Sequence, residues 1–201
     1  MGIRRLAALG VALAAGGCVP QQSLVLSSHY TPPVSDVRVT RVPARGRSVC
    51  LVGIISLKDE RADPTTLGTV LGRPVRPPPD VMQWLQQIML ALNAPGLSVV
   101  LNDAPSAGTR LEVELVTAWV TELRTAKSAN IVLRVTYHHG DGGAAEAPKL
   151  YRGAASSIDW NAGDGELQRM IDRALAGIVA QMQSDLLAGC RTNGGGAAAA
   201  R

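Results

Sequence analysis

Apolar residues recur along the chain with the spacings of strands and helices, beginning with a nearly continuous apolar run over 49–57. Such a run predicts a buried central strand. The Pro- and Gly-rich stretch 62–79 follows, and we expect it to be a loop. Asp80 and Gln83 then form a capping-box pattern that predicts the start of a helix. The apolar positions after the cap follow helical spacing: Val81, Trp84, Leu85, Ile88 and Leu92.

Segments with strand patterns come next, at 97–103, 109–123, 129–139 and 149–160. Apolar and polar residues alternate in the second and third of these segments, as expected for strands with one buried face. The glycines of "GDGG" at 140–143 predict a turn between the last two strands. In 109–123 the alternation predicts one buried face, formed by Leu111, Val113, Leu115, Trp119 and Leu123.

A long helix is predicted from Asp164 onward, with an apolar stripe more than five turns long that must pack against another surface. The elements then follow the order β-α-β-β-β-β-α. We predict an α+β fold with a single antiparallel or mixed sheet and two helices packed on one face. With phenylalanine absent, the core must consist of Val, Leu, Ile, Ala and Met.

The N-terminus has the pattern of an export signal that ends in a cysteine. Arg4 and Arg5 precede an apolar stretch over 6–15, which is too short to span a bilayer. Small residues follow and lead directly to Cys18, as in a bacterial lipobox, although Ala15 stands where leucine is usual. We therefore expect residues 1–17 to be a signal peptide and Cys18 to become an acylated N-terminus. An ordinary secretory signal with an unrelated cysteine is the alternative.

Residues 18–47 are expected to form the lipidated N-terminus and a flexible tether, because they are Pro-, Ser- and Gln-rich and lack periodicity. Valine rather than aspartate after Cys18 favours the outer membrane, at its periplasmic face. A globular domain over 48–190 and a disordered tail over 191–201 complete the predicted organisation.

Net charge gives little reason to expect a nucleic-acid partner. The formal net charge of +4 includes Arg4 and Arg5, and without them 18 basic residues face 16 acidic ones. Four arginines cluster in the predicted tether, and we interpret them as a solvated linker that could also lie against anionic headgroups. The members of this cluster are Arg38, Arg41, Arg45 and Arg47.

Cys50 and Cys190 remain once Cys18 is acylated. In an oxidising compartment two thiols can pair, and we expect a disulfide between them. The alternative is two separate thiols, with Cys50 buried in a strand and Cys190 in a frayed helix end.

The segment "DERADPTTLG" resembles part of the YajG-type family of bacterial lipoproteins. Asp59 and Arg61 match an Asp-x-Arg pattern at a strand end, followed by Leu-Gly at Leu67 and Gly68. A Tyr-x-Gly on the last strand and a long C-terminal helix extend the resemblance over roughly 48–188. It implies an anchored envelope protein without an established activity. The broader architecture is also similar to auxiliary lipoproteins of ABC-type lipid transport systems.

Asp59, Arg61 and Gly68 are the candidate residues that organise the loop or contact a partner. An Asp–Arg pair at the end of a central strand can hold the following loop through charge-assisted hydrogen bonds. The same pair could instead form a polar mouth that receives a partner or ligand. Both interpretations stay open at this stage.

Catalytic and metal-binding patterns are absent from the sequence. His138 and His139 point to opposite sides of one strand, and no Gly-x-Ser-x-Gly elbow or phosphate-binding loop occurs. We expect no enzymatic activity, no cofactor and no metal.

The sequence therefore predicts a non-enzymatic envelope lipoprotein, anchored by acylated Cys18, that docks to another envelope protein. The alternative is a lipid-binding auxiliary subunit of an ABC-type transport system, with phospholipid in an apolar groove. An unrecognised hydrolase is the third hypothesis.

Overall fold

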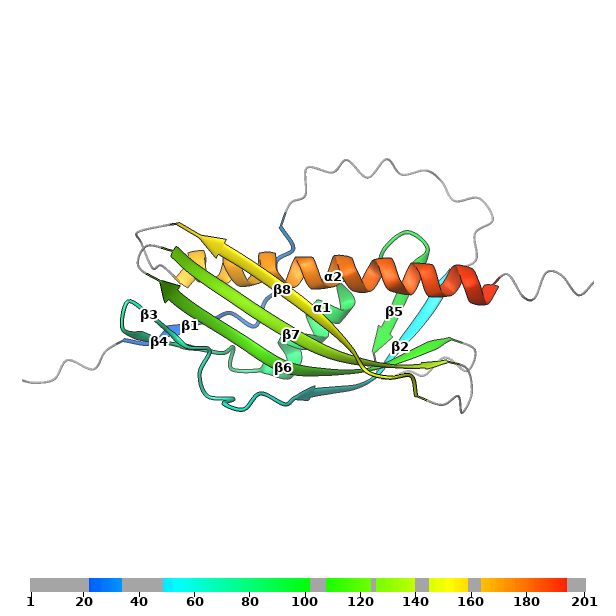
Figure 1. The fold of residues 1–201 in the computed structure, drawn as a ribbon, viewed down its shortest axis with the longest axis horizontal. Helices are drawn as coiled ribbons and strands as arrows, with labels where there is room; N and C mark the ends of the chain where they lie inside the picture. Colours follow the sequence, from blue (N-terminus) through cyan, green and yellow to red (C-terminus); the bar gives the residue numbers. More distant parts are fainter. Residues whose placement is uncertain are drawn as a thin grey trace, which may run out of the picture.

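The structure, a computed structural model, describes residues 22–33, 49–101, 108–123, 126–139, 145–158 and 164–194, and these form two sheets and two helices (Figure 1). Strands β5-β2-β6-β7-β8 form the large sheet and strands β1-β4-β3 the small sheet. The elements in chain order are β1 (Leu24–Val25), β2 (Cys50–Asp59), β3 (Thr69–Val70), β4 (Arg73–Arg76), α1 (Val81–Leu90), β5 (Leu97–Leu101), β6 (Thr109–Leu123), β7 (Ala126–His139), β8 (Lys149–Ser157) and α2 (Asp164–Gly194).

The large sheet is mixed. β2 runs parallel to both of its neighbours, β5 and β6, whereas β6, β7 and β8 pair antiparallel. As the alternating sequence patterns predict, every second side chain of these strands faces the core. In the middle of β7 the buried side chains are Ile131, Leu133 and Val135. Their polar neighbours face outward, so the strands predicted from periodicity are confirmed.

Helix α2 lies lengthwise across one face of the large sheet, with α1 beside it (Figure 1). Contact with β8 is so close that a Cβ on Gly153 would lie 2.0 Å from the carbonyl oxygen of Ala174. The side-chain amide of Gln183 joins the helices by donating to the carbonyls of Ala91 and Leu92, each at 3.2 Å. Apolar side chains of both helices and the large sheet thus share one core.

The prediction of a single sheet is wrong, because the stretch 62–79 is not simply a loop. It contains β3 and β4, which pair antiparallel, and β1 adds to β4 in parallel. The bridge from Gly68 to Val120 joins this region to the far end of β6. These strands are two to four residues long, too short for a period-2 pattern to appear.

Residues 22–33 pack on the domain, although the sequence places them within the tether; we name them the N-terminal strap. Leu24, Leu26 and Tyr30 of the strap are buried. Its backbone amides bond to both helices, since Ser27 donates to Gln168 Oε1 at 2.9 Å and Tyr30 donates to Gln87 Oε1 at 3.0 Å. The N-terminal strap is therefore held against the domain.

Trp119 lies outside the core, contrary to the predicted buried face of 109–123. The register of β6 against β7 shifts between Leu115 and Thr117. A shift by one residue exchanges the two faces of a strand, so Ala118 and Val120 turn inward and Trp119 is 46% exposed.

A disulfide joins Cys50 at the start of β2 to Cys190 in the last part of α2, with 5.9 Å between their Cα atoms. Helix α2 continues to Gly194, beyond the predicted start of the tail. Several predicted features lie outside the described residues: the signal segment 1–17, Cys18, the arginine cluster at 38–47, the "GDGG" turn and residues 195–201.

Candidate docking groove

Asp59 is the last residue of β2, and the Arg61 side chain donates two hydrogen bonds to its carboxylate. Arg61 Nε donates to Asp59 Oδ1 at 2.8 Å, and Arg61 Nη2 donates to Asp59 Oδ2 at 2.7 Å. The Arg61 side chain is 3% exposed and that of Asp59 is 17% exposed. These bonds hold the pKa of the Asp59 carboxyl below its usual value, so the pair is ionic at neutral pH.

The loop after Arg61 is fixed by short-range polar contacts. Arg61 Nη2 also donates to the carbonyl of Pro64 at 3.2 Å. Asp63 Oδ1 accepts from the Thr65 amide at 2.8 Å and from the Thr65 hydroxyl at 2.6 Å, as in an Asx-turn. The loop thus has a defined shape beside the end of β2.

Gly68 closes this loop against the large sheet. The amide of Val120 donates to the carbonyl of Leu67 at 2.6 Å, and a Cβ on Gly68 would lie 2.1 Å from the Val120 carbonyl oxygen. The φ angle of Gly68 is +112°, which glycine adopts readily and which is strained for other residues. Only glycine fits this junction between the two sheets.

A proline run forms the opposite wall. Pro77, Pro78 and Pro79 lead from β4 into α1, where Asp80 caps the helix by accepting from the Gln83 amide at 2.8 Å. The predicted N-cap is confirmed. Proline fixes φ and has no amide hydrogen, so this wall keeps its course with few hydrogen bonds.

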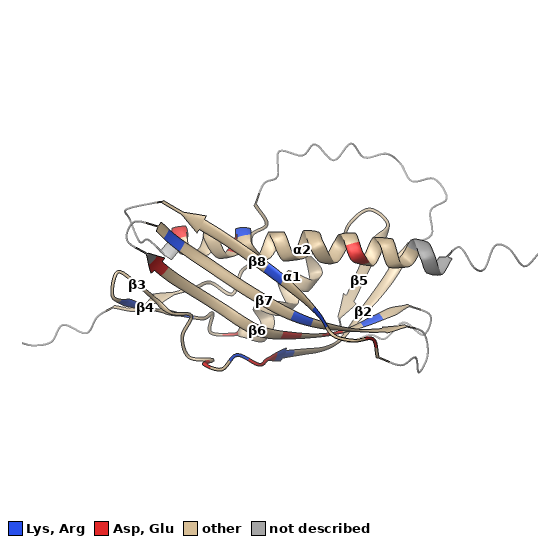
Figure 2. Ribbon diagram, viewed as in Figure 1, with Lys and Arg blue, Asp and Glu red and all other residues tan. Residues whose placement is uncertain are grey.

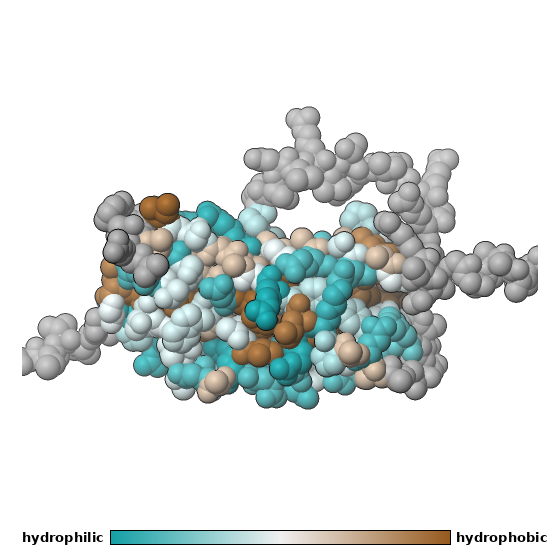
Figure 3. Space-filling view, in the orientation of Figure 1, coloured by the Kyte–Doolittle hydropathy of each residue, from teal (hydrophilic) through white to brown (hydrophobic). Residues whose placement is uncertain are grey.

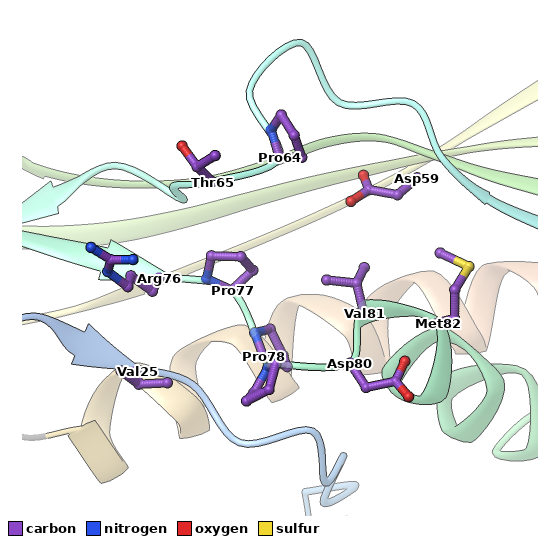
Figure 4. Close-up of a pocket in the computed structure, with 11 residues that line it drawn as sticks. Val25, Asp59, Pro64, Thr65, Arg76, Pro77, Pro78, Asp80, Val81 and Met82 are labelled. Carbon is purple, nitrogen blue, oxygen red and sulfur yellow. The ribbon is translucent and has the colours of Figure 1, made fainter.

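An open groove of about 720 Å³ lies between these two walls (Figure 4). Asp59 and Pro64 stand on one side, and the prolines and the first residues of α1 stand on the other. Its lining is Val25, Asp59, Pro64, Thr65, Arg76, Pro77, Pro78, Pro79, Asp80, Val81 and Met82. Apolar side chains alternate here with two carboxylates and one guanidinium.

This lining suits recognition by shape and charge. The described residues that line the groove include no histidine, cysteine or lysine, and the Thr65 hydroxyl is engaged by Asp63. Across all described residues, no group of three His, Cys, Asp or Glu side chains is placed to hold a metal ion.

The structure brings Asp59 and Arg61 together at this groove and places Gly68 at the nearby junction of the sheets. Cys50 and Cys190 lie apart from it as a disulfide. Cys18 is outside the described residues. Sequence reasoning missed Arg76 and the proline wall, because their approach to Asp59 depends on the small sheet.

The sequence analysis also did not predict two polar clusters that lie outside the groove. Tyr137 and Tyr151 share a hydrogen bond, and the Tyr151 hydroxyl donates to Asp185 Oδ2 at 2.7 Å, which ties β7 and β8 to α2. Burial raises the pKa of Tyr137 to about 12. Lys127, 1% exposed, pairs with Glu166 at 3.2 Å. In the sequence, Lys127 shares the inward-facing parity of Ala129 and Ile131 in β7, and this would have indicated that its side chain is buried.

Comparisons with known proteins show the fold. No family model matches the chain, and no curated protein matches its sequence. The solved protein XCC0632 of Xanthomonas campestris, assigned to the family DUF330, aligns with a TM-score of 0.56 at 12% identity, over 86% of this chain and 98% of that one. The chain shares that fold.

Other solved structures are similar at lower scores. An uncharacterised protein aligns with a TM-score of 0.51 at 12% identity, over 70% of this chain and 94% of its own. A minor lipoprotein of Acinetobacter baumannii aligns at 16% identity over 71% and 94%, with a TM-score of 0.43 that is too low to support a conclusion. None of these structures singles out the YajG-type family.

Among the described residues, neither helix combines the length and the apolar character needed to cross a bilayer.

Proposed function

We propose that this chain is an envelope lipoprotein, held at the periplasmic face of the outer membrane by acyl chains on Cys18, and that its domain docks to another envelope protein. The signal-like segment and the cysteine after it support the anchor. Kinship with the YajG-type family, on the order and spacing of residues 48–188, belongs to the same proposal.

The groove is the observation that supports docking. It is open, and one wall is held by the bidentate Arg61–Asp59 pair while prolines stiffen the other. Preformed walls lower the entropy that a partner loses on binding. Apolar side chains beside two carboxylates and the Arg76 guanidinium favour a segment of a partner protein that carries both apolar and charged residues.

Formaldehyde cross-linking in cells, followed by affinity purification and mass spectrometry, tests this site. The variant Thr65→Arg places a long side chain at the exposed rim of the groove, and Ser184→Arg places the same side chain on exposed α2. We expect one reproducible partner whose recovery falls several-fold with Thr65→Arg and stays unchanged with Ser184→Arg. Equal recovery of every partner with both variants would remove the groove as the docking site.

The anchor is tested separately by metabolic labelling with palmitate. The wild-type chain should incorporate label and sediment with membranes, and Cys18→Ser should do neither. A labelled Cys18→Ser chain, or an unlabelled wild type, contradicts the proposed anchor.

A lipid-handling role is the second candidate, because Val25, Val81 and Met82 give the groove an apolar part. Native mass spectrometry of the purified domain distinguishes the two. Bound phospholipid that is lost with Thr65→Arg would favour the auxiliary subunit of an ABC-type transport system over protein docking.

A further inference from the structure

One end of the molecule carries the start of the N-terminal strap. Arg73 Nε donates to the carbonyl of Gln22 at 2.7 Å, which fixes the first described residue beside the turn between β3 and β4. This turn, Leu71–Gly72, is itself tied to the large sheet, because the Leu71 amide donates to Glu122 Oε2 at 2.5 Å.

Leu71 has an unusual conformation for its type. Its φ is +51°, a region that leucine rarely adopts, and its side chain is 54% exposed. A two-residue hairpin turn of this kind favours Asn or Gly, which tolerate positive φ. A strained, exposed leucine contributes little to folding, so its apolar side chain points to a role outside the domain.

A second exposed apolar residue lies at the same end. Ile158 is 78% exposed and directly follows Ser157. Ser157 pairs with Lys127 and Lys127 pairs with Glu122, the residue that holds the Leu71 amide. Neighbouring strands are about 5 Å apart, so Ser157 and Glu122 are about two strand spacings apart at the end of the sheet that carries the β3–β4 turn. Figure 3 shows apolar surface at this end of β8.

A basic side chain accompanies the apolar ones. Arg73 directly follows the turn at the start of β4, and Figure 2 shows a basic residue there. Exposed leucine and isoleucine flanked by arginine match the border between acyl chains and anionic headgroups.

The short chain length between Cys18 and Gln22 indicates that the partner of this surface is the lipid leaflet. Four residue steps reach at most about 15 Å when fully extended. If acyl chains on Cys18 enter a leaflet, Gln22 and the turn beside it are held within about that distance of the lipid surface.

We propose that Leu71 and Ile158 form a second contact with the phospholipid leaflet that holds the acyl chains, with Arg73 at its headgroups. This contact rests on the proposed anchor at Cys18. It fixes the orientation of the domain, with the β3–β4 turn toward the membrane and the disulfide end of α2 away from it.

Site-specific photo-crosslinking of the full acylated chain in bacterial membranes tests the contact. A benzophenone amino acid is placed singly at position 71, 158 or 150. Leu150 is the matched control, because it is a similarly exposed leucine (47%) near the other end of β8. We expect phospholipid adducts at positions 71 and 158 in several-fold higher yield than at position 150.

A second variant separates membrane contact from fold. Leu71→Asn keeps a residue that tolerates positive φ and removes the apolar side chain. We expect the adduct yield at position 158 to fall in this background while the Tm is unchanged or higher. A lower Tm with an unchanged adduct yield would make Leu71 structural and overturn the proposal.

Palmitate labelling of the same samples distinguishes the two proposals. Acylated protein without phospholipid adducts at 71 and 158 overturns the second contact and leaves the anchor intact. Protein adducts at these positions also overturn it, because they place a protein rather than lipid on this surface. Unacylated protein without adducts removes both.

Discussion

The large and small sheets are built in different ways. In the large sheet, strands of five to fifteen residues bury alternating apolar side chains under two helices. In the small sheet, strands of two to four residues bury one apolar side chain each (Leu24, Val70 and Val75), and the hydrogen bonds around Gly68 add to this burial. Long alternating patterns therefore define the large sheet, whereas the small sheet combines a few buried apolar side chains with individual hydrogen bonds.

The largest effect is expected where α2 meets the large sheet. Gly153→Ala forces a Cβ against the carbonyl of Ala174, which is backbone and cannot move alone. The free energy of unfolding should fall by about 3 kcal/mol or more, as for other overpacked cores. Urea denaturation followed by circular dichroism measures it.

The same substitution at Gly177 is the control. Gly177 lies in α2 with no atom within 4 Å of an added Cβ, so Gly177→Ala should be neutral or stabilise by up to about 1 kcal/mol. Similar losses for both variants would show that close contact at Gly153 is not the cause.

The next largest loss of unfolding free energy is expected when the disulfide is removed. The double variant Cys50→Ala/Cys190→Ala frees β2 from α2, and we expect a loss of about 3 kcal/mol. Reductant should lower the Tm of the wild type by a similar amount and leave the double variant unaffected. A reductant effect on the double variant would contradict this assignment.

Alanine substitution of one buried leucine in each sheet compares the stability of the two sheets. Leu24 in β1 and Leu133 in β7 are both fully buried. Each change to alanine should cost about 2–4 kcal/mol. Hydrogen exchange should show Leu133→Ala lowering protection throughout, and Leu24→Ala lowering it only in the strap and small sheet. Uniform loss in both variants would mean that the sheets open as one unit.

The Asp59–Arg61 pair predicts a smaller, pH-dependent effect near the groove. The pKa of Asp59 is lowered in the folded state, so its contribution is present above about pH 4 and is lost as pH falls through the folded pKa. The difference in unfolding free energy between wild type and Asp59→Asn should therefore shrink as the pH is lowered from 6 to 2. Other carboxylates are common to both chains, so parallel curves would contradict the prediction.

Alkaline pH tests one buried tyrosine in the N-terminal strap and one in the large sheet. Burial raises the pKa of Tyr30 in the strap and of Tyr137 in the large sheet to about 12. Their contributions are complete below about pH 10 and are lost as pH rises through 12. Ultraviolet titration of the folded chain should show no tyrosine step near pH 10, and Tyr30→Phe should reduce the later step.

The large sheet and both helices follow from the sequence because their periodic patterns are long. The small sheet does not, since Leu24 finds its partner Val75 far along the chain and neither strand shows a period. Trp119 was misplaced for a local reason, a register shift that the alternation does not reveal. The Asp-x-Arg spacing predicted the pair at the groove, whereas the second wall required the tertiary structure.

The position of β2 has a consequence for how the chain assembles as it is made. β2 ends at Asp59, but the strands on its two sides begin only at Leu97 and Thr109. This ten-residue strand, with its apolar run, is therefore synthesised long before either neighbour exists. Until β2 pairs with these neighbours it is an aggregation-prone segment, so we expect a holding chaperone to bind the unfolded chain there and to be released when β6 pairs with it.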